Sequence, residues 1–363
     1  MRIRIVLILV LLVMISAYAG TIVDYSCVSL PATPYNYANI SFPQDIINNL
    51  SAMDNMPSTN PTSDAGASLG RVLFYDKDLS INHTIACASC HLQKFSFTDT
   101  ARFSRGFNGQ VTSRNSMGLI HARFQRDGQF FWDNRAATLE TQTLIPFQSP
   151  VEMGMTLDTL VARVAAKPLY NTLFQNAFGS GTVTSDRISK ALAQFVRSMN
   201  TFGSKFRQGV NITNGNPETT PFSNFTAQEN QGKDLFMDIY RGNCQACHTR
   251  NVMVQQGAQN IGLDSIYADN GVGTATGNHR KDGLFSVPSL INIELTAPYM
   301  HDGRFKTLYE VINHYTEGIH QSKTLSEKLK KPIQLSANEK VDLVAFLFTL
   351  TDKEFLYDPR FMY

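Results

Sequence analysis

Two short cysteine motifs constrain what this chain can fold into more than any other feature. Residues 87–91 read Cys-Ala-Ser-Cys-His, and residues 244–248 read Cys-Gln-Ala-Cys-His. Two thiols at this spacing can form thioether bonds to both vinyl groups of a haem, and the adjacent histidine can then ligate the iron. The motifs therefore predict two covalently attached c-type haems. The predicted attachment and iron-ligand residues are Cys87, Cys90, His91, Cys244, Cys247 and His248.

Cysteine pairs also occur in redox dithiols and in zinc sites with four cysteine ligands. A redox dithiol does not account for the histidine that directly follows each pair. A zinc site rarely takes its two halves from segments as far apart as residues 87–90 and 244–247. Haem attachment is the interpretation that uses the cysteines and the histidines together.

The N-terminus has the pattern of a secretory signal peptide. Arg2 and Arg4 precede an apolar run over residues 5–15, and residues 17–19 read Ala-Tyr-Ala, a small-residue cleavage pattern. We therefore expect residues 1–19 to be removed on export, which agrees with haem attachment outside the cytoplasm. A retained membrane anchor is the alternative, although the run is shorter than the roughly 20 apolar residues that span a bilayer.

The fifth cysteine, Cys27, lies in a polar, proline-bearing stretch. We expect residues 20–43 to be a leader that buries too little apolar surface to fold alone, with Cys27 as an unpaired thiol. A lipid-anchor cysteine is the alternative, but the preceding residues 23–26, Val-Asp-Tyr-Ser, make a poor lipobox.

Two passages with the same order of parts indicate a duplication. Residues 70–76 read Gly-Arg-Val-Leu-Phe-Tyr-Asp, residues 232–238 read Gly-Lys-Asp-Leu-Phe-Met-Asp, and each passage leads into one cysteine motif. Each predicts a short helix. The chain beyond the predicted signal peptide is long enough for two domains of roughly 150 residues, each with its own core.

Most of the remaining pattern is helical. An amphipathic run follows Ser185, and capping boxes at Thr226 and Ser336 predict two further helix starts. Polar stretches at 208–224 and 256–284 indicate loops, and strand signals are confined to short pieces near Phe130 and Val287. The predicted fold is mainly α, with two cytochrome c-like helical domains. Their predicted ranges are 44–207 and 208–352, followed by a tail at 353–363.

The charge balance argues against one class of partner. Lysine plus arginine total 32 and aspartate plus glutamate total 30, so nothing indicates a nucleic-acid surface. A small partner protein or a small molecule is the better expectation.

Further motifs carry a family resemblance. They occur in a fixed order around the two cysteine motifs, and the ordered set resembles the bacterial dihaem cytochrome c peroxidases and their relative MauG over residues 66–350. The segments that carry it are 114–116 (Arg-Asn-Ser), 130–136 (Phe-Phe-Trp-Asp-Asn-Arg-Ala), Gln142, 151–154 (Val-Glu-Met-Gly), 287–290 (Val-Pro-Ser-Leu), 295–303 (Leu-Thr-Ala-Pro-Tyr-Met-His-Asp-Gly) and 307–308 (Thr-Leu).

The resemblance implies roles for individual residues. The haem at His91 would bind peroxide in a peroxidatic N-terminal domain, and the haem at His248 would pass electrons. Glu152 matches the distal carboxylate that moves a proton between the two peroxide oxygens, and Gln142 matches the polar residue beside it. Trp132 matches the ring between the haems. A solvated surface carboxylate and a core aromatic are the alternatives for Glu152 and Trp132.

The resemblance also implies a calcium ion between the domains. Asn115, Thr296 and Pro298 match its ligands, the last two through backbone carbonyls. Oxygen-only ligation suits a hard cation. Thr296 and Pro298 are also ordinary turn residues, which is the alternative.

Two departures from the family pattern bear on which kind of enzyme within the family this chain resembles. No histidine lies between His91 and Asn115, where typical members carry a distal one, so we expect the first haem to be open in the oxidised state; His121 is expected to be structural.

Tyr315 stands where typical members have the methionine ligand of the second haem, and MauG has a tyrosine there. Phenolate oxygen favours higher iron oxidation states than thioether sulfur does. Met300 and His301 are rival ligands, and an exposed helix tyrosine is the remaining alternative.

Three functions are compatible with these features. The first is a periplasmic peroxidase that reduces hydrogen peroxide to water with electrons from a small donor such as a cytochrome c or a cupredoxin. The second is a MauG-like enzyme that oxidises side chains of a partner protein through a high-valent two-haem state. The third is a non-catalytic electron-transfer cytochrome. Family members often dimerise, so a homodimer is a further expectation.

Overall fold

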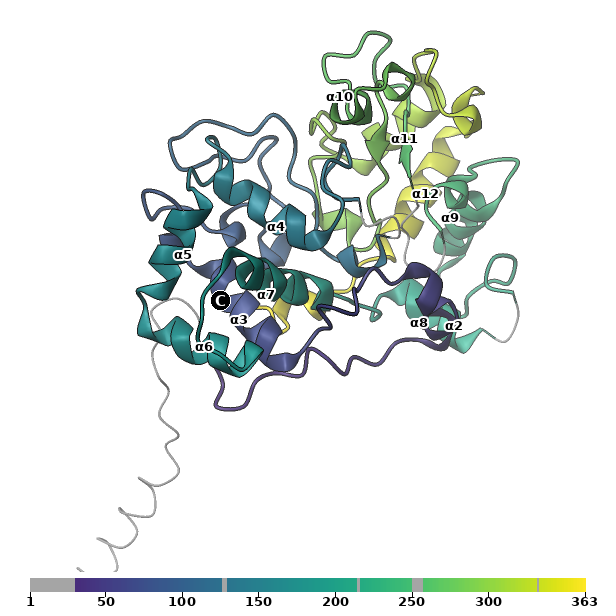
Figure 1. The fold of residues 1–363 in the computed structure, drawn as a ribbon. Helices are drawn as coiled ribbons and strands as arrows, with labels where there is room; N and C mark the ends of the chain where they lie inside the picture. The colour runs from purple at the N-terminus through teal and green to yellow at the C-terminus, as the bar shows by residue number, and fades with distance from the viewer. Residues whose placement is uncertain (1–29, 126–128, 214–215, 250–256, 332) are drawn as a thin grey trace, which may run out of the picture.

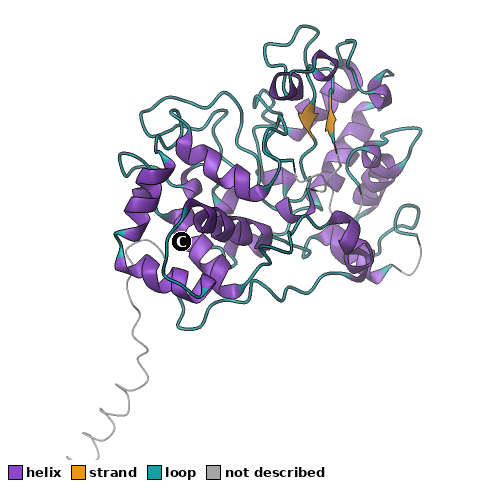
Figure 2. Cartoon of the chain, viewed as in Figure 1, coloured by secondary structure: helices purple, strands orange, loops and turns teal. Residues whose placement is uncertain are grey.

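The computed structural model describes residues 30–125, 129–213, 216–249, 257–331 and 333–363. The predicted signal peptide and Cys27 lie outside this range. The described chain is mainly helical with one pair of short strands, which confirms the predicted class (Figures 1 and 2). The helices are α2 (Gln44–Met53), α3 (Asp64–Tyr75), α4 (Leu139–Gln148), α5 (Leu157–Ala165), α6 (Pro168–Phe178), α7 (Ser185–Ser198), α8 (Lys205–Ile212), α9 (Ala227–Met237), α10 (Val272–Thr276), α11 (Leu308–Glu317) and α12 (Ala337–Phe348). The antiparallel strands are β1 (Ala258–Gln259) and β2 (Phe285–Ser286).

The first helix group surrounds α3, which packs against α7 and α6 while α4 packs on α7 (Figure 1). The Ser63 hydroxyl caps α3 by accepting a hydrogen bond from the Gly66 amide. A Cβ added at Gly70 would lie 2.0 Å from the Ala191 carbonyl oxygen on α7. Glycine is therefore needed for the two helix backbones to approach this closely.

The second helix group repeats this contact. Helix α9 packs against α12, and a Cβ added at Gly232 would lie 1.9 Å from the Asp342 carbonyl oxygen on α12. Four residues further along the two repeated passages, Phe74 contacts Phe195 and Phe236 contacts Phe346. The same glycine and phenylalanine positions thus make the same kind of helix contact twice, which supports the duplication seen in the sequence.

The capping boxes at Thr226 and Ser336 are confirmed as the N-caps of α9 and α12. The loop predicted over 208–224 is wrong at its start, because Ser204 caps a helix that continues to Ile212. The predicted domain boundary between residues 207 and 208 therefore lies inside α8, and the two domain ranges stay a prediction.

Both ends of the described chain pack onto the first helix group. Tyr37, in the predicted leader, is 1% exposed, and Phe361, in the predicted tail, is 0% exposed. The Tyr37 hydroxyl donates to the Arg360 carbonyl at 2.6 Å, and the C-terminus lies beside α3 and α6 (Figure 1). Within the described residues, no helix has the length and apolar character needed to cross a membrane.

Candidate active site

The first cysteine motif begins at the 3-10 helix η2 (Cys87–Ser89), which follows α3. The His91 amide donates to the Cys87 carbonyl at 3.0 Å, so one backbone turn carries both thiols and the imidazole. Burial raises the pKa of Cys87 to about 12 and that of Cys90 to about 11. Reactive redox cysteines have a lowered pKa instead, which argues against a redox dithiol.

His91 is placed to ligate a metal through one ring nitrogen. Its Nδ1 lies 2.8 Å from the Phe97 carbonyl oxygen, which makes Nδ1 the protonated donor and leaves Nε2 for a metal. Burial also lowers the pKa of His91, which favours the neutral imidazole that ligates metals. The residues of this motif therefore fit a covalently held haem.

Glu152 lies beside this motif. Burial raises the pKa of Glu152, while the Arg135 guanidinium and the Ser149 side chain act in the opposite direction. The Glu152 carboxylate also adds to the raised pKa of Cys87 and of Cys90, after the larger effect of burial. The structure thus brings together a carboxylate and two thiols from separate parts of the sequence.

Helix α4 connects Glu152 to Gln142. Thr138 caps the helix, and Gln142 is half-buried near its start. Beyond the end of α4, the Ser149 hydroxyl accepts a hydrogen bond from the Glu152 amide at 3.2 Å. One short segment therefore sets the positions of both predicted polar residues.

The stretch 105–108 packs onto the backbone around Glu152. The Phe107 amide donates to the Glu152 carbonyl at 3.0 Å. A Cβ added at Gly106 would lie 1.6 Å from the Val151 carbonyl oxygen, so only glycine permits this approach. His121 lies elsewhere, with Nε2 2.9 Å from the Thr201 carbonyl oxygen in a buried position, as a structural residue would.

The second cysteine motif lines a cavity of about 670 Å³. Cys244, Cys247, His248 and Tyr315 all lie on its wall. Burial raises the pKa of Tyr315, and the nearby Cys247 and Cys244 add to the rise. Burial likewise raises the pKa of Cys244 to about 12. This donor set and this volume fit a second haem, with the phenol of Tyr315 close to its attachment thiols.

The rival ligands Met300 and His301 line the same cavity. The His301 ring stacks on Phe285 with ring centroids 3.6 Å apart, and the His301 carbonyl accepts from the Asn115 amide at 2.8 Å. The three side chains share one site, so the sixth ligand of the second haem stays a prediction.

Trp132 lies on the wall of the second motif's cavity. Its Nε1 donates to the Asn115 carbonyl at 2.8 Å, and its own carbonyl accepts from the Ser286 amide at 2.7 Å. The ring lines the cavity of the second motif, as does Met117, whose carbonyl also faces His91. The indole is therefore held on the same cavity wall as Met117, which also contacts the first motif.

The predicted calcium ligands Asn115, Thr296 and Pro298 all line this cavity. The Asn115 amide nitrogen donates to the Ala101 and Arg102 carbonyls, each at 3.2 Å. The amide oxygen of Asn115 is therefore the atom that remains to face a cation.

Sequence reasoning did not assign some residues that shape these sites. Arg114 bridges Asp133 at 2.5 Å and Asp269 at 2.7 Å, which ties together three distant segments beside Asn115. Arg114 and Arg135 both lie inside motifs that carry the family resemblance, and their charge is the sequence feature that could have identified them as site residues. Ser149 and Gly106 act through backbone contacts and gave no such signal.

A helical fold with two Cys-x-x-Cys-His sites, one of them beside a half-buried carboxylate, defines a class of proteins with paired c-type haem motifs. The family model for dihaem cytochrome c peroxidases matches residues 64–214. The methylamine utilization protein MauG of Methylophilus methylotrophus is 30% identical over 81% of this chain and 84% of its own length. The cytochrome c551 peroxidase of Nitrosomonas europaea is 32% identical over 78% and 79%. The chain belongs to the dihaem cytochrome c peroxidase family.

Solved structures agree with this assignment. A MauG-like protein associated with microbial copper homeostasis superposes with a TM-score of 0.79 at 33% identity, over 89% of this chain and 98% of that chain. The diheme peroxidase BthA from Burkholderia thailandensis shares the fold, with a TM-score of 0.69 at 21% identity, over 91% of this chain and 92% of that chain.

Proposed function

We propose that this chain is a periplasmic peroxidase that reduces hydrogen peroxide to two waters, with two protons and with two electrons from a small donor such as a cytochrome c or a cupredoxin. Family membership supports the reaction class. The observation that carries the proposal is the position of Glu152, a half-buried carboxylate beside Cys87 and Cys90.

A haem attached through Cys87 and Cys90 and ligated by His91 would supply an iron that binds peroxide and takes part in breaking its oxygen–oxygen bond. Glu152 takes the proton from the inner peroxide oxygen and returns it to the outer one, so that water leaves. Burial raises the pKa of Glu152, while the Arg135 guanidinium and the Ser149 side chain favour its deprotonated form. A raised pKa makes the carboxylate a stronger acceptor of the proton from the inner peroxide oxygen.

Trp132 is the proposed relay for electrons that arrive at the second haem. Its backbone hydrogen bonds and its place on the cavity wall support this role, because a fixed ring shortens the gap between the two sites. Gln142, on the segment that leads to Glu152, is proposed to orient peroxide beside the carboxylate.

Replacement of Glu152 tests the proposal. Steady-state turnover of peroxide with reduced cytochrome c should fall by about 10²- to 10⁴-fold in Glu152→Gln, the usual contribution of general acid–base catalysis. Glu327→Gln, at an exposed carboxylate 80% open to solvent, is the matched control and should turn over as the parent does. Equal rates of peroxide turnover in parent and Glu152→Gln would rule out the proposed proton transfer, and no turnover in either would favour a plain electron-transfer cytochrome.

Tyr315 favours a second candidate, a MauG-like enzyme that oxidises side chains of a partner protein. Its phenol lies close to the thiols of the second motif, and a phenolate ligand would help the second site store oxidising equivalents. The distinguishing experiment adds peroxide first without any electron donor and then with reduced cytochrome c. A slow return to the resting spectrum that only a protein substrate accelerates supports this candidate, whereas rapid steady turnover with cytochrome c supports the first.

The finer parts of the assignment are proposals as well. They comprise removal of residues 1–19 on export, peroxidatic and electron-transfer domains at 44–207 and 208–352, a homodimer, and a calcium ion held by Asn115, Thr296 and Pro298. The shared position of these three residues on the cavity wall supports the cation site.

A further inference from the structure

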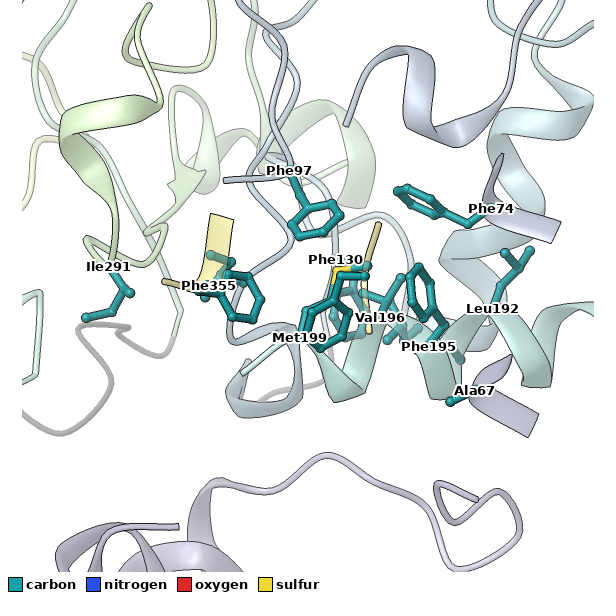
Figure 3. Packing of buried hydrophobic residues seen from close by; sticks show 14 of the residues in the cluster. Ala67, Phe74, Phe97, Phe130, Leu192, Phe195, Val196, Met199, Ile291 and Phe355 are labelled. Carbon is teal, nitrogen blue, oxygen red and sulfur yellow. The ribbon is translucent and has the colours of Figure 1, made fainter. Parts of the chain in front are cut away.

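The last residues of the chain return to the first helix group. After α12, the chain leaves the second group and ends beside α3 (Figure 1). Phe355 and Phe361 are both buried, and their ring centroids lie 5.0 Å apart. Both rings contact Phe97, at 6.2 Å and 6.3 Å between centroids, and Figure 3 shows Phe97 with Phe355 on one side and Phe74 on the other. The tail therefore completes the core next to the first cysteine motif.

Hydrogen bonds fix the tail backbone at several points. The Tyr75 hydroxyl donates to the Phe361 carbonyl at 2.5 Å, and the Arg71 Nε donates to the Met362 carbonyl at 2.7 Å. The side-chain Nε2 of Gln93, two residues after the first motif, donates to the Asp358 carbonyl at 3.1 Å. The tail is thus a fitted part of the first site rather than a loose extension.

Phe97 is the link between the tail and the iron ligand. Its side chain is 0% exposed, and its φ of 59° and the φ of 61° at Ser96 put both residues in the left-handed region that L-residues rarely adopt. Surrounding contacts must hold such a backbone in place. The carbonyl of Phe97 is the group that accepts from His91 Nδ1 at 2.8 Å.

We propose that Phe355 and Phe361 are positioning residues for the first haem: they hold Phe97 so that its carbonyl fixes and strengthens His91 as the iron ligand. The proposal rests on haem attachment at His91, which is part of the proposed function, and it does not depend on which oxidant the enzyme uses.

The expected effect arises from the hydrogen bond. A carbonyl that accepts from Nδ1 makes the imidazole a stronger donor through Nε2, and a stronger donor stabilises ferric iron. Loosening Phe97 should therefore weaken the bond between iron and His91 and raise the reduction potential of the first haem. The second haem, ligated by His248 on a different turn, should not respond.

Phe361→Leu tests this in the haem-loaded full chain, because it removes ring contacts while keeping most of the volume. Phe222→Leu is the matched control: Phe222 is equally buried in an aromatic cluster of the second helix group, 5.8 Å from Phe206. The iron–histidine stretching frequency is measured by resonance Raman spectroscopy on the reduced protein, and each haem is titrated separately. Gln93→Ala, which removes the hydrogen bonds from Gln93 Nε2 to the Phe355 and Asp358 carbonyls, is the second variant.

Phe361→Leu should lower the stretching frequency and raise the potential of the first haem alone, Gln93→Ala should shift both in the same direction, and Phe222→Leu should shift neither. Unchanged first-haem signals in Phe361→Leu, or equal shifts in Phe361→Leu and Phe222→Leu, overturn the proposal. A parent protein that binds both haems but does not turn over peroxide would instead refute the peroxidase function, and the Raman comparison would still decide the role of the tail.

Discussion

Replacement of Glu140 should destabilise the segment that positions the first site. Glu140 stands in the first turn of α4 and accepts two hydrogen bonds from Arg197 of α7, at 2.6 Å and 2.9 Å. The two side chains are 18% and 2% exposed, so Glu140→Gln leaves a buried guanidinium without its counter-charge. Breaking a buried pair in this way costs about 3–5 kcal/mol. Arg197 keeps a bond to Asn55 at 3.1 Å, which places the expected loss at about 3 kcal/mol.

Urea unfolding of parent and variant measures this loss. Asp186→Asn is the control, because Asp186 and Lys190 form an exposed pair one helical turn apart, worth at most about 0.5 kcal/mol. Although burial opposes it, Arg197 and Asn60 lower the pKa of Glu140. The pair is therefore fully stabilising above the ordinary glutamate pKa of about 4.3, and the difference between parent and Glu140→Gln should shrink as pH falls below it. A loss under about 1 kcal/mol at pH 7 would refute the buried-pair reasoning.

Three further predictions concern the site, the duplication and the cation. Burial raises the pKa of Glu152, and the proposed mechanism needs its carboxylate deprotonated to accept a proton. The kcat/KM of the parent should therefore fall as pH drops through a pKa above the ordinary glutamate range. Glu152→Gln should lack this fall in kcat/KM at low pH. Gly70→Ala and Gly232→Ala should each lower the free energy of unfolding in urea by about 2 kcal/mol, because overpacking against a backbone outweighs alanine's better helix propensity. A stabilised variant would contradict the close helix contacts. Chelation should remove one calcium ion per chain and lower turnover in the parent, and Asn115→Ala should bind none; a parent free of calcium would contradict the cation site.

The elements that sequence predicted well are those specified locally. The two repeated passages and the capping boxes at Thr226 and Ser336 each lie within a few residues of the structure that they determine, and all appear as expected. Ser204 caps α8 with Arg207 at the third helical position, so no capping box marks this helix, and the polar composition of 208–224 predicts a loop instead.

The tail shows why the rest could not be predicted. Nothing in residues 353–363 indicates that Phe361 will pack against Phe97, because the contact joins residues from opposite ends of the chain. The same limit applies to Gly106, whose close approach to Val151 depends on how two loops meet. Motif spacing identified the chemistry of the first site, whereas tertiary packing determines how its iron ligand is supported.

Covalent haem content tests the central claim most directly. The exported protein is denatured, and its haem is measured per polypeptide by pyridine haemochrome absorbance together with the intact mass. Two haems per chain are predicted, and one in a variant with both Cys87 and Cys90 changed to serine. A denatured polypeptide that is colourless, or whose mass includes no porphyrin, would contradict the account.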